Sequence, residues 1–79
     1  MDLKITEMYA FIATEKDGQE GIMAFYDAST GMMLPMVGAD VARVKSLLMM
    51  AETISRASGA TYRICKFTNR QDITDQVKD

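Results

Sequence analysis

Histidine and tryptophan are both missing from this 79-residue chain, and cysteine and proline occur once each. Without histidine the chain lacks the commonest metal ligand and the one side chain that ordinarily titrates near neutral pH. A single cysteine allows no internal disulfide and no CxxC pair for metal or redox chemistry, which fits a reducing compartment. Metal enzymes and histidine-dependent triads are therefore not expected, and no metal or other cofactor is predicted.

Long apolar runs are missing as well. No stretch approaches the roughly 18 apolar residues that a membrane span needs, and the N-terminus lacks the basic and apolar regions of a signal peptide. We therefore expect a soluble, cytoplasmic protein with no membrane partner. The length allows one domain over residues 1–79, and 48% hydrophobic with 25% charged residues is an ordinary globular composition.

Three apolar runs in the first half of the chain predict antiparallel strands. They are separated by turn residues, with Asp17 and Gly18 in the first turn and Gly31 in the second. Pro35 cannot donate a ladder hydrogen bond, so the third strand should be short and lie at an edge. The three predicted strands cover residues 8–13, 21–26 and 32–36.

One long helix is predicted from Val41 to the residue before Gly59. Asp40 suits its N-cap, and Gly59 suits the position just past its C-terminus. At 100° per residue, six apolar side chains fall within an arc of about 140°, as for a helix packed on a sheet. These are Val41, Val44, Leu47, Leu48, Ala51 and Ile54.

Beyond the helix, residues 61–67 predict a half-buried strand, and the capping-box pattern of residues 68–71 predicts a short helical turn. The fold class that follows is α+β. We expect a small antiparallel sheet, in the order β-β-β-α-β, with one long helix packed on one face.

The first two predicted strands are apolar at nearly every position, so both faces of their hairpin need cover. One helix covers only one face. At about 25 cal/mol per Å², leaving 400 Å² open would forgo about 10 kcal/mol, comparable to the stability of a small domain. We therefore expect a homodimer that forms through the other sheet face or through a flank of methionines.

Eight methionines are a high count for this length, and adaptable thioethers suit a contact surface. The alternative is that surface methionines carry no meaning, while Met8 and Met23 fill gaps in the core. The candidate interface residues are Tyr9, Phe11, Met33, Met36, Met49 and Met50.

Charge is unevenly distributed along the chain, with a net −5 over residues 1–40 and +5 over residues 41–70. The basic segment could hold a small anionic ligand such as a nucleotide, or simply give the fold a dipole. Nucleic acid is not expected as a partner, because aromatic interleaving, an RNP motif and a helix-turn-helix pair are all lacking. The candidate anion-binding residues are Arg43, Arg63, Lys66 and Arg70.

Cys65 is the one side chain that could serve as a thiolate nucleophile, since Arg63 and Lys66 are its neighbours in sequence. The alternative is an inert, small core residue. Asp40 and the glycine before it suggest an anion site at the helix N-terminus, but the carboxylate of a plain N-cap would repel an anion.

Three short segments resemble a pattern in small proteins of bacteria and their phages, to which no activity is attached. The segments are residues 35–40, 43–47 and 66–70, followed by Asp72 and Ile73. The resemblance would extend over about residues 7–77. It implies a bacterial or phage accessory protein and transfers no functional residue.

These observations predict a small non-enzymatic module for protein–protein interaction or regulation. We expect a homodimer that acts, for example as an inhibitor, by occupying the surface of a host or partner protein. The alternative is an oligomer that holds a small anionic ligand between its subunits. A minimal enzyme that uses Cys65 is the third hypothesis.

Overall fold

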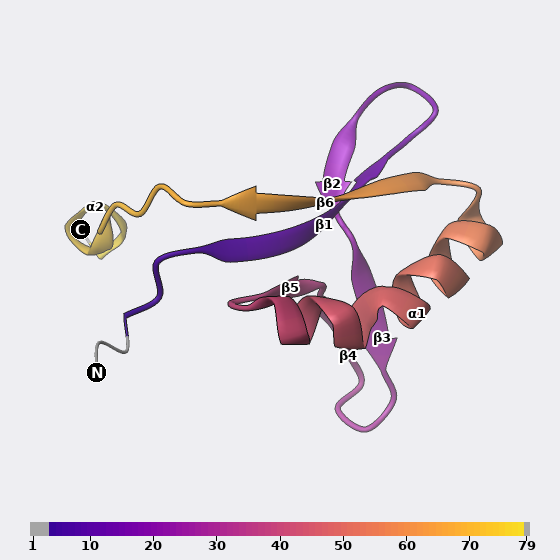
Figure 1. Cartoon of the computed structure of the whole chain (residues 1–79), viewed down its shortest axis with the longest axis horizontal. Helices are drawn as coiled ribbons and strands as arrows, with labels where there is room; N and C mark the ends of the chain where they lie inside the picture. The colour runs from indigo at the N-terminus through magenta and orange to yellow at the C-terminus, as the bar shows by residue number, and fades with distance from the viewer. Residues whose placement is uncertain (1–3, 79) are drawn as a thin grey trace.

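A computed structural model of the chain describes residues 4–78 and has the α+β class that the sequence predicts, with small antiparallel sheets and one long helix packed against strands (Figure 1). The elements follow in the order β1 (Met8–Thr14), β2 (Glu20–Ile22), β3 (Ala24–Asp27), β4 (Met32–Pro35), β5 (Val37–Gly38), α1 (Val41–Ser58), β6 (Thr61–Phe67) and α2 (Thr74–Val77).

Strand β1 is the centre of the larger sheet. On one side β6 pairs with it along its whole length, from Met8 opposite Phe67 to Thr14 opposite Thr61. On the other side β2 pairs with the second half of β1 and β5 pairs with the first half. All three pairings are antiparallel. The ladder between β1 and β6 is the longest of the described strands.

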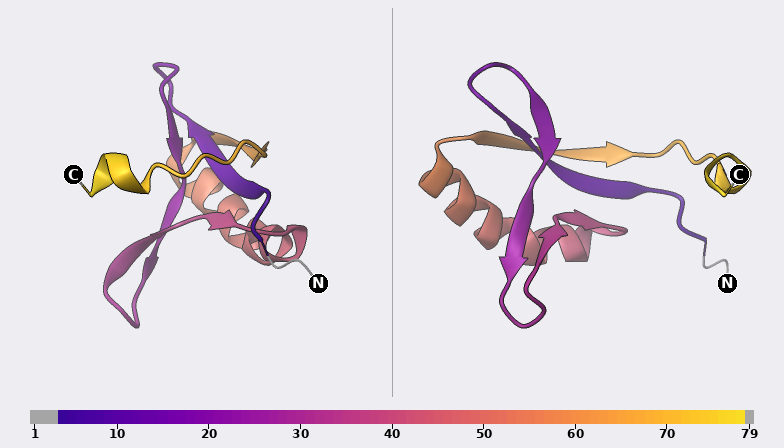
Figure 2. Two further views of the ribbon diagram at one scale, coloured as in Figure 1. Left: turned by 90° about the vertical axis from the view of Figure 1, so that its left-hand side faces the viewer. Right: turned by 180° about the vertical axis from the view of Figure 1, so that it is seen from behind.

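The expectation of three consecutive strands in one sheet is wrong. The predicted second strand breaks at Met23 and the predicted third strand breaks at Met36, so that β3 and β4 form a separate two-stranded sheet. This hairpin projects away from the larger sheet (Figure 2). Pro35 is the last residue of β4, opposite Ala24, in a sheet where each strand is an edge, as its missing N–H requires.

Three backbone hydrogen bonds hold the junction where the strands break. The Met23 N–H donates to the Phe11 carbonyl at 2.8 Å, the Phe11 N–H donates to the Met36 carbonyl at 3.1 Å, and the Met36 N–H donates to the Met23 carbonyl at 2.8 Å. All three side chains are buried. The chain therefore bends at Met23 and Met36 because both side chains turn into the core.

Helix α1 begins and ends where the sequence predicts. The Asp40 carboxylate accepts a hydrogen bond from the Arg43 N–H at 2.8 Å, which caps the first turn. Gly59, with a φ of 76°, takes the left-handed conformation after the last turn, and its N–H donates to the Ser55 carbonyl at 2.9 Å.

The hydrophobic core lies between α1 and one face of the larger sheet. Phe11 of β1 is fully buried there, and the ring of Tyr62 on β6 lies 5.9 Å from the Phe11 ring. The buried cluster consists of Phe11, Met23, Met36, Val44, Leu47 and Ala51. The prediction that Met23 fills the core is confirmed, whereas Met8 is exposed.

The two end segments of the described chain extend side by side away from the core, as an arm that ends in α2 (Figure 1). The Arg70 guanidinium donates to the Ile5 carbonyl at 3.2 Å and joins them. The predicted helical turn at residues 68–71 is wrong, because this segment is extended and the turn begins at Thr74. There the Asp72 carboxylate accepts a hydrogen bond from the Thr74 N–H at 3.0 Å, whereas the N-cap residue, Ile73, makes no side-chain cap.

Candidate interaction surfaces

The face of the larger sheet that points away from α1 has no helix packed on it (Figure 2). Because Tyr9, Phe11 and Ala13 face the core, the alternate residues of β1 and their cross-strand partners face the other way. We call this surface the rear face. Ile22 and Phe67 are 55% and 52% exposed on this face, whereas Ala10 is buried. The apolar residues of the rear face are Met8, Ala10, Ile12, Ile22, Val37, Cys65 and Phe67.

The structure places the six candidate interface residues on different surfaces. Phe11 and Met36 are fully buried in the core, so neither can contact a partner. Tyr9 also faces α1, and its hydroxyl donates to the Glu7 carboxylate at 2.9 Å. The physical reason is strand alternation, which puts Tyr9 and Phe11 on the same, covered face of β1.

The other three candidates are exposed but lie apart. Met33 is 60% exposed on the projecting β3–β4 hairpin, opposite Tyr26. Met49 and Met50 are 82% and 39% exposed on α1, and their angular positions put them on different sides of the buried stripe of Val44, Leu47 and Ala51. The three methionines therefore do not form one patch.

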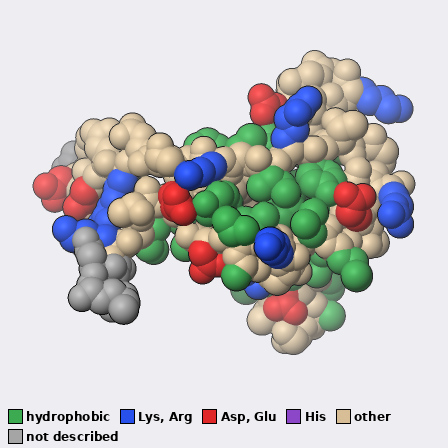
Figure 3. Space-filling view, viewed as in Figure 1, with side chains coloured by type: hydrophobic (Ala, Val, Ile, Leu, Met, Phe, Trp, Pro, Cys, Tyr) green, Lys and Arg blue, Asp and Glu red, His purple; other side chains and the backbone are tan. Residues whose placement is uncertain are grey.

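A shallow groove lies between the C-terminal half of α1 and β6. Figure 3 shows hydrophobic side chains gathered between these two elements. The groove measures about 640 Å³ and is lined by Glu52 and Ser55 of α1 and by residues 61–65 of β6, among which Ile64 is 41% exposed.

Two side-chain hydrogen bonds hold the two sides of the groove together. The Tyr62 hydroxyl donates to the Glu52 carboxylate, and the Ser55 hydroxyl donates to the Ala60 carbonyl. The first of these bonds raises the pKa of Tyr62, since ionising the hydroxyl would break it beside a carboxylate. Periodicity did not predict this groove, because the groove depends on how α1 and β6 lie beside each other.

The four candidate anion-binding residues do not converge on one site. Arg63 and Lys66 lie on opposite faces of β6, with Arg63 on the rear face. Arg70 binds a backbone carbonyl in the arm, and Arg43 packs beside Gly38 at the start of α1. The Lys66 ammonium lies 3.4 Å from the Glu7 carboxylate, so it already has an anionic partner.

The Glu7, Tyr9 and Lys66 side chains form a small polar cluster at the base of the arm. The hydrogen bond from Tyr9, followed by that from Lys66, lowers the pKa of Glu7. The same hydrogen bond to Glu7 raises the pKa of Tyr9. This cluster links the start of β1 to the end of β6. Its two charged groups, Glu7 and Lys66, are paired with each other.

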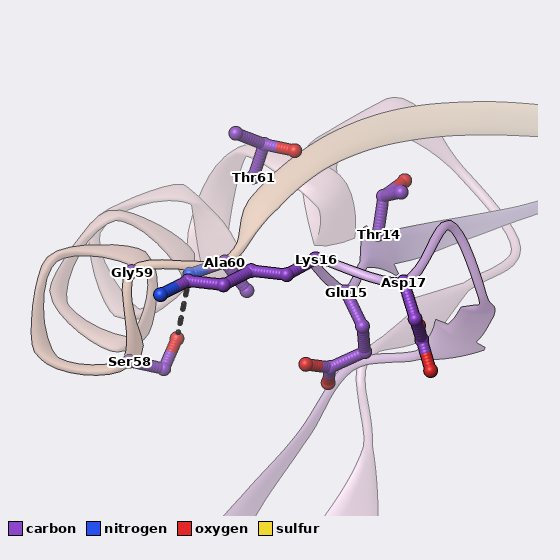
Figure 4. A pocket seen from close by; sticks show the side chains of 8 residues that line it. All are labelled: Thr14, Glu15, Lys16, Asp17, Ser58, Gly59, Ala60 and Thr61. Atoms are coloured by element: carbon purple, nitrogen blue, oxygen red, sulfur yellow. Dashed lines mark hydrogen bonds between the residues drawn. The ribbon is translucent and has the colours of Figure 1, made fainter.

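An open cleft of about 590 Å³ lies between the β1–β2 turn and the C-terminal end of α1 (Figure 4). Its charged side chains, Glu15, Lys16 and Asp17, are all exposed. The Ser58 hydroxyl accepts a hydrogen bond from the Ala60 N–H at 3.2 Å, which closes the end of the helix. Among the described residues no polar side chain is buried, so this cleft offers no preorganised polar group to a substrate.

The remaining chemical candidates are isolated in space. Cys65 is half-buried on the rear face, opposite Ala10. Within residues 4–78 no three His, Cys, Asp or Glu side chains are grouped so that they could hold a metal ion. The same part of the chain contains no helix with the length and hydropathy of a membrane span.

Comparisons with protein families, with curated proteins and with solved structures found no match to this chain. The surfaces described above are therefore interpreted on their own geometry and chemistry.

Proposed function

We propose that this chain is a module for protein–protein interaction that works as a homodimer and acts by occupying the surface of another protein. The observation that carries the proposal is the amount of surface that a single copy exposes. The chain has a solvent-accessible surface of 6533 Å² for a mass of 8.8 kDa. A compact monomer of this mass exposes about 4,800 Å².

The excess of about 1,700 Å² on one copy is about twice the roughly 800 Å² that each partner buries in an interface of standard size, so one copy exposes more than enough surface for one interface. The radius of gyration of 14.6 Å agrees with it, since about 12 Å is expected for a compact chain of this length. Part of the excess comes from the arm and the β3–β4 hairpin, and these also present apolar side chains. Phe67 and Met33, for example, are 52% and 60% exposed.

Two apolar surfaces support both halves of the proposal. The rear face and the groove between α1 and β6 adjoin along β6, whose Arg63 and Cys65 border both, but the rear-face side chains of β1 and β2 do not line the groove. A homodimer needs one of them. The second surface is then available to a protein partner, which is how a module without chemistry of its own would regulate or inhibit.

Light scattering on the purified chain, over a hundredfold range of concentration, tests the first half of this proposal. We expect a mass of twice 8.8 kDa at the higher concentrations, with dissociation on dilution. A constant mass of 8.8 kDa throughout would contradict the homodimer.

A further inference from the structure

The outer edge of β6 has unpaired backbone groups, and the hydrogen bonds of the core junction show which ones. Phe11 of β1 bonds through both its N–H and its carbonyl to Met36 and Met23, on the side of β1 away from β6. Backbone groups alternate sides along a strand, so Ala10 and Ile12 of β1 direct theirs toward β6. Their partners in register, Cys65 and Arg63, direct theirs back toward β1.

The residues between them must therefore point their backbone groups outward. These are Tyr62, Ile64 and Lys66, and β6 is the last strand on its side of the sheet. No backbone hydrogen bond within residues 4–78 involves the outer edge of β6. Such an open edge is a template for another strand.

On the face that α1 covers, the side chains beside this edge are those of Tyr62, Ile64 and Lys66. Ile64 is 41% exposed there, and Leu48 on the helix is 38% exposed. A strand added at this edge supplies hydrogen bonds to the unpaired backbone groups. Its side chains also cover the partly exposed apolar side chains beside the edge.

We propose that the strand added at this edge is β6 of a second copy, paired antiparallel about a two-fold axis at Ile64. This inference rests on the proposed homodimer and says where its subunits join. Ile64 then lies opposite Ile64 of the partner subunit, and Tyr62 lies opposite Lys66 of the partner subunit. The three outward-facing residues of each copy meet one another in register, and the two larger sheets become one.

Charge and shape on α1 fit the same two-fold axis. Tyr62 is joined to Glu52, and two residues along a strand span about the same length as four residues along a helix. Ile64 therefore lies level with Leu48. In an antiparallel arrangement about that level, Lys45 of one helix lies within one residue of the level of Glu52 of the partner subunit, and the exposed Met49 lies near the axis.

Each copy thus contributes one acidic and one basic side chain to two symmetric pairs, as an isologous interface requires. The stem of Lys66 packs against the ring of Tyr62 of the partner subunit, and that ring carries Glu52 at its hydroxyl. In this register Arg63 lies opposite Cys65 of the partner subunit, and the two copies of Arg63 approach each other diagonally across the axis. Both guanidinium groups lie on the rear face, where water reaches them.

Disulfide trapping tests the position of the axis. In a Cys65→Ser background, Ile64→Cys places two thiols opposite each other with Cα atoms about 5.5 Å apart, within disulfide range. We expect mild oxidation to give a covalent dimer at least about tenfold faster than with the control Ile22→Cys in the same background. Ile22 is more exposed than Ile64, 55% against 41%, but it lies on the rear face of β2.

The outcomes separate this inference from the proposed function. If light scattering shows a dimer but the Ile22→Cys variant cross-links and the Ile64→Cys variant does not, the edge pairing is wrong and the homodimer stands. If the chain is monomeric at every concentration, the proposed homodimer falls and this inference falls with it.

Charge variants give a second readout that does not depend on oxidation. Ile64→Lys should weaken the dimer by about 100-fold, because it buries two like charges at the axis, while the matched Ile22→Lys changes it less than about threefold. Lys45→Glu alone and Glu52→Lys alone should each weaken the dimer, and the double exchange should restore it. Equal effects at Ile64 and Ile22, or no restoration by the double exchange in chains that keep their circular dichroism, would overturn the proposal.

Discussion

Gly38 shows how much depends on single residues in a core this small. It is buried in β5, opposite Tyr9, and the side chain of Arg43 from the first turn of α1 lies directly over it. A Cβ at position 38 would lie 2.7 Å from Cγ and 2.9 Å from Cβ of Arg43. The absence of a side chain therefore lets the start of α1 approach β5.

The first prediction follows from this close approach. Gly38→Ala should destabilise the chain by about 1–3 kcal/mol, because β5 and the first turn of α1 must move apart. Gly21→Ala is the matched control, since a Cβ there would meet nothing within 4 Å. Urea unfolding of both variants measures the difference, and equal midpoints would contradict the close packing at Gly38.

The second prediction concerns acid. The Asp27 carboxylate accepts hydrogen bonds from the Ser29 hydroxyl at 2.8 Å and the Ser29 N–H at 3.1 Å, and these lower the pKa of Asp27 below its ordinary 3.8. A lowered pKa in the folded state adds stability that is fully present above that ordinary value and is lost as the pH falls through the folded value. The pKa of Asp72 is lowered in the same way by Thr74.

Stability should therefore fall as the pH is lowered from about 4 toward 2. Asp27→Asn should flatten that fall, because the amide does not titrate. Urea midpoints measured at several pH values in this window check the expectation. Identical pH profiles of the wild-type chain and Asp27→Asn would show that the turn carboxylate makes no contribution.

At the scale of the elements, helix α1 presents two neighbouring leucines to different surroundings. Leu47 is 4% exposed in the core cluster, whereas Leu48 is 38% exposed and lines a surface hollow of α1 together with Lys45, Met49 and Glu52. Periodicity alone placed both in one apolar arc of about 140°. The sheet covers only part of that arc, and the uncovered part is the surface that our inference gives to a second copy.

The third prediction uses this pair. Leu47→Ala should cost about 2–5 kcal/mol, because it leaves a cavity beneath the helix. Leu48→Ala should cost a monomer less, since the side chain is already partly in water, but it should weaken the dimer. Chemical unfolding at low concentration together with light scattering separates the two effects. Equal losses of monomer stability would show that both leucines lie in the core.

The strands show what periodicity cannot decide. The runs at residues 21–26 and 32–36 are apolar throughout, and nothing in their composition distinguishes Met23 or Met36 from their neighbours. The breaks occur at these residues because both methionines turn into the core and bond to each other and to Phe11. Capping and positive φ depend on the residue itself. The cap at Asp40 and the turn conformations of Gly59 and Gly31 were therefore predictable.

At the scale of the whole molecule, the amount of exposed surface governs stability. Under the proposed dimer, a chain that exposes about 1,700 Å² more than a compact monomer of its mass gains stability when it associates. Folding and association are then linked, and the folded state is favoured at high protein concentration.

The fourth prediction is a melting temperature that depends on concentration. A tenfold increase in protein concentration should raise the Tm by about 3–6 °C, given the unfolding enthalpy of a dimer of this size. Circular dichroism melts at several concentrations measure it. The Ile64→Lys variant should melt at a lower temperature with a weaker dependence, and a wild-type Tm that does not change with concentration would contradict linked folding and assembly.

The sequence by itself determined the α+β class, both ends of the long helix, the turn glycines and the shortage of cover for an apolar sheet, because each depends on a local residue preference or on total composition. Only the tertiary structure decided that the predicted strands break at two methionines, that Phe11 and Met36 are buried, and that the four cations lie apart. These properties depend on which residues far apart in the chain share a face, and strand pairing sets that. The free edge of β6 belongs to the second group, since it exists only because β1 has its other neighbours on the opposite side.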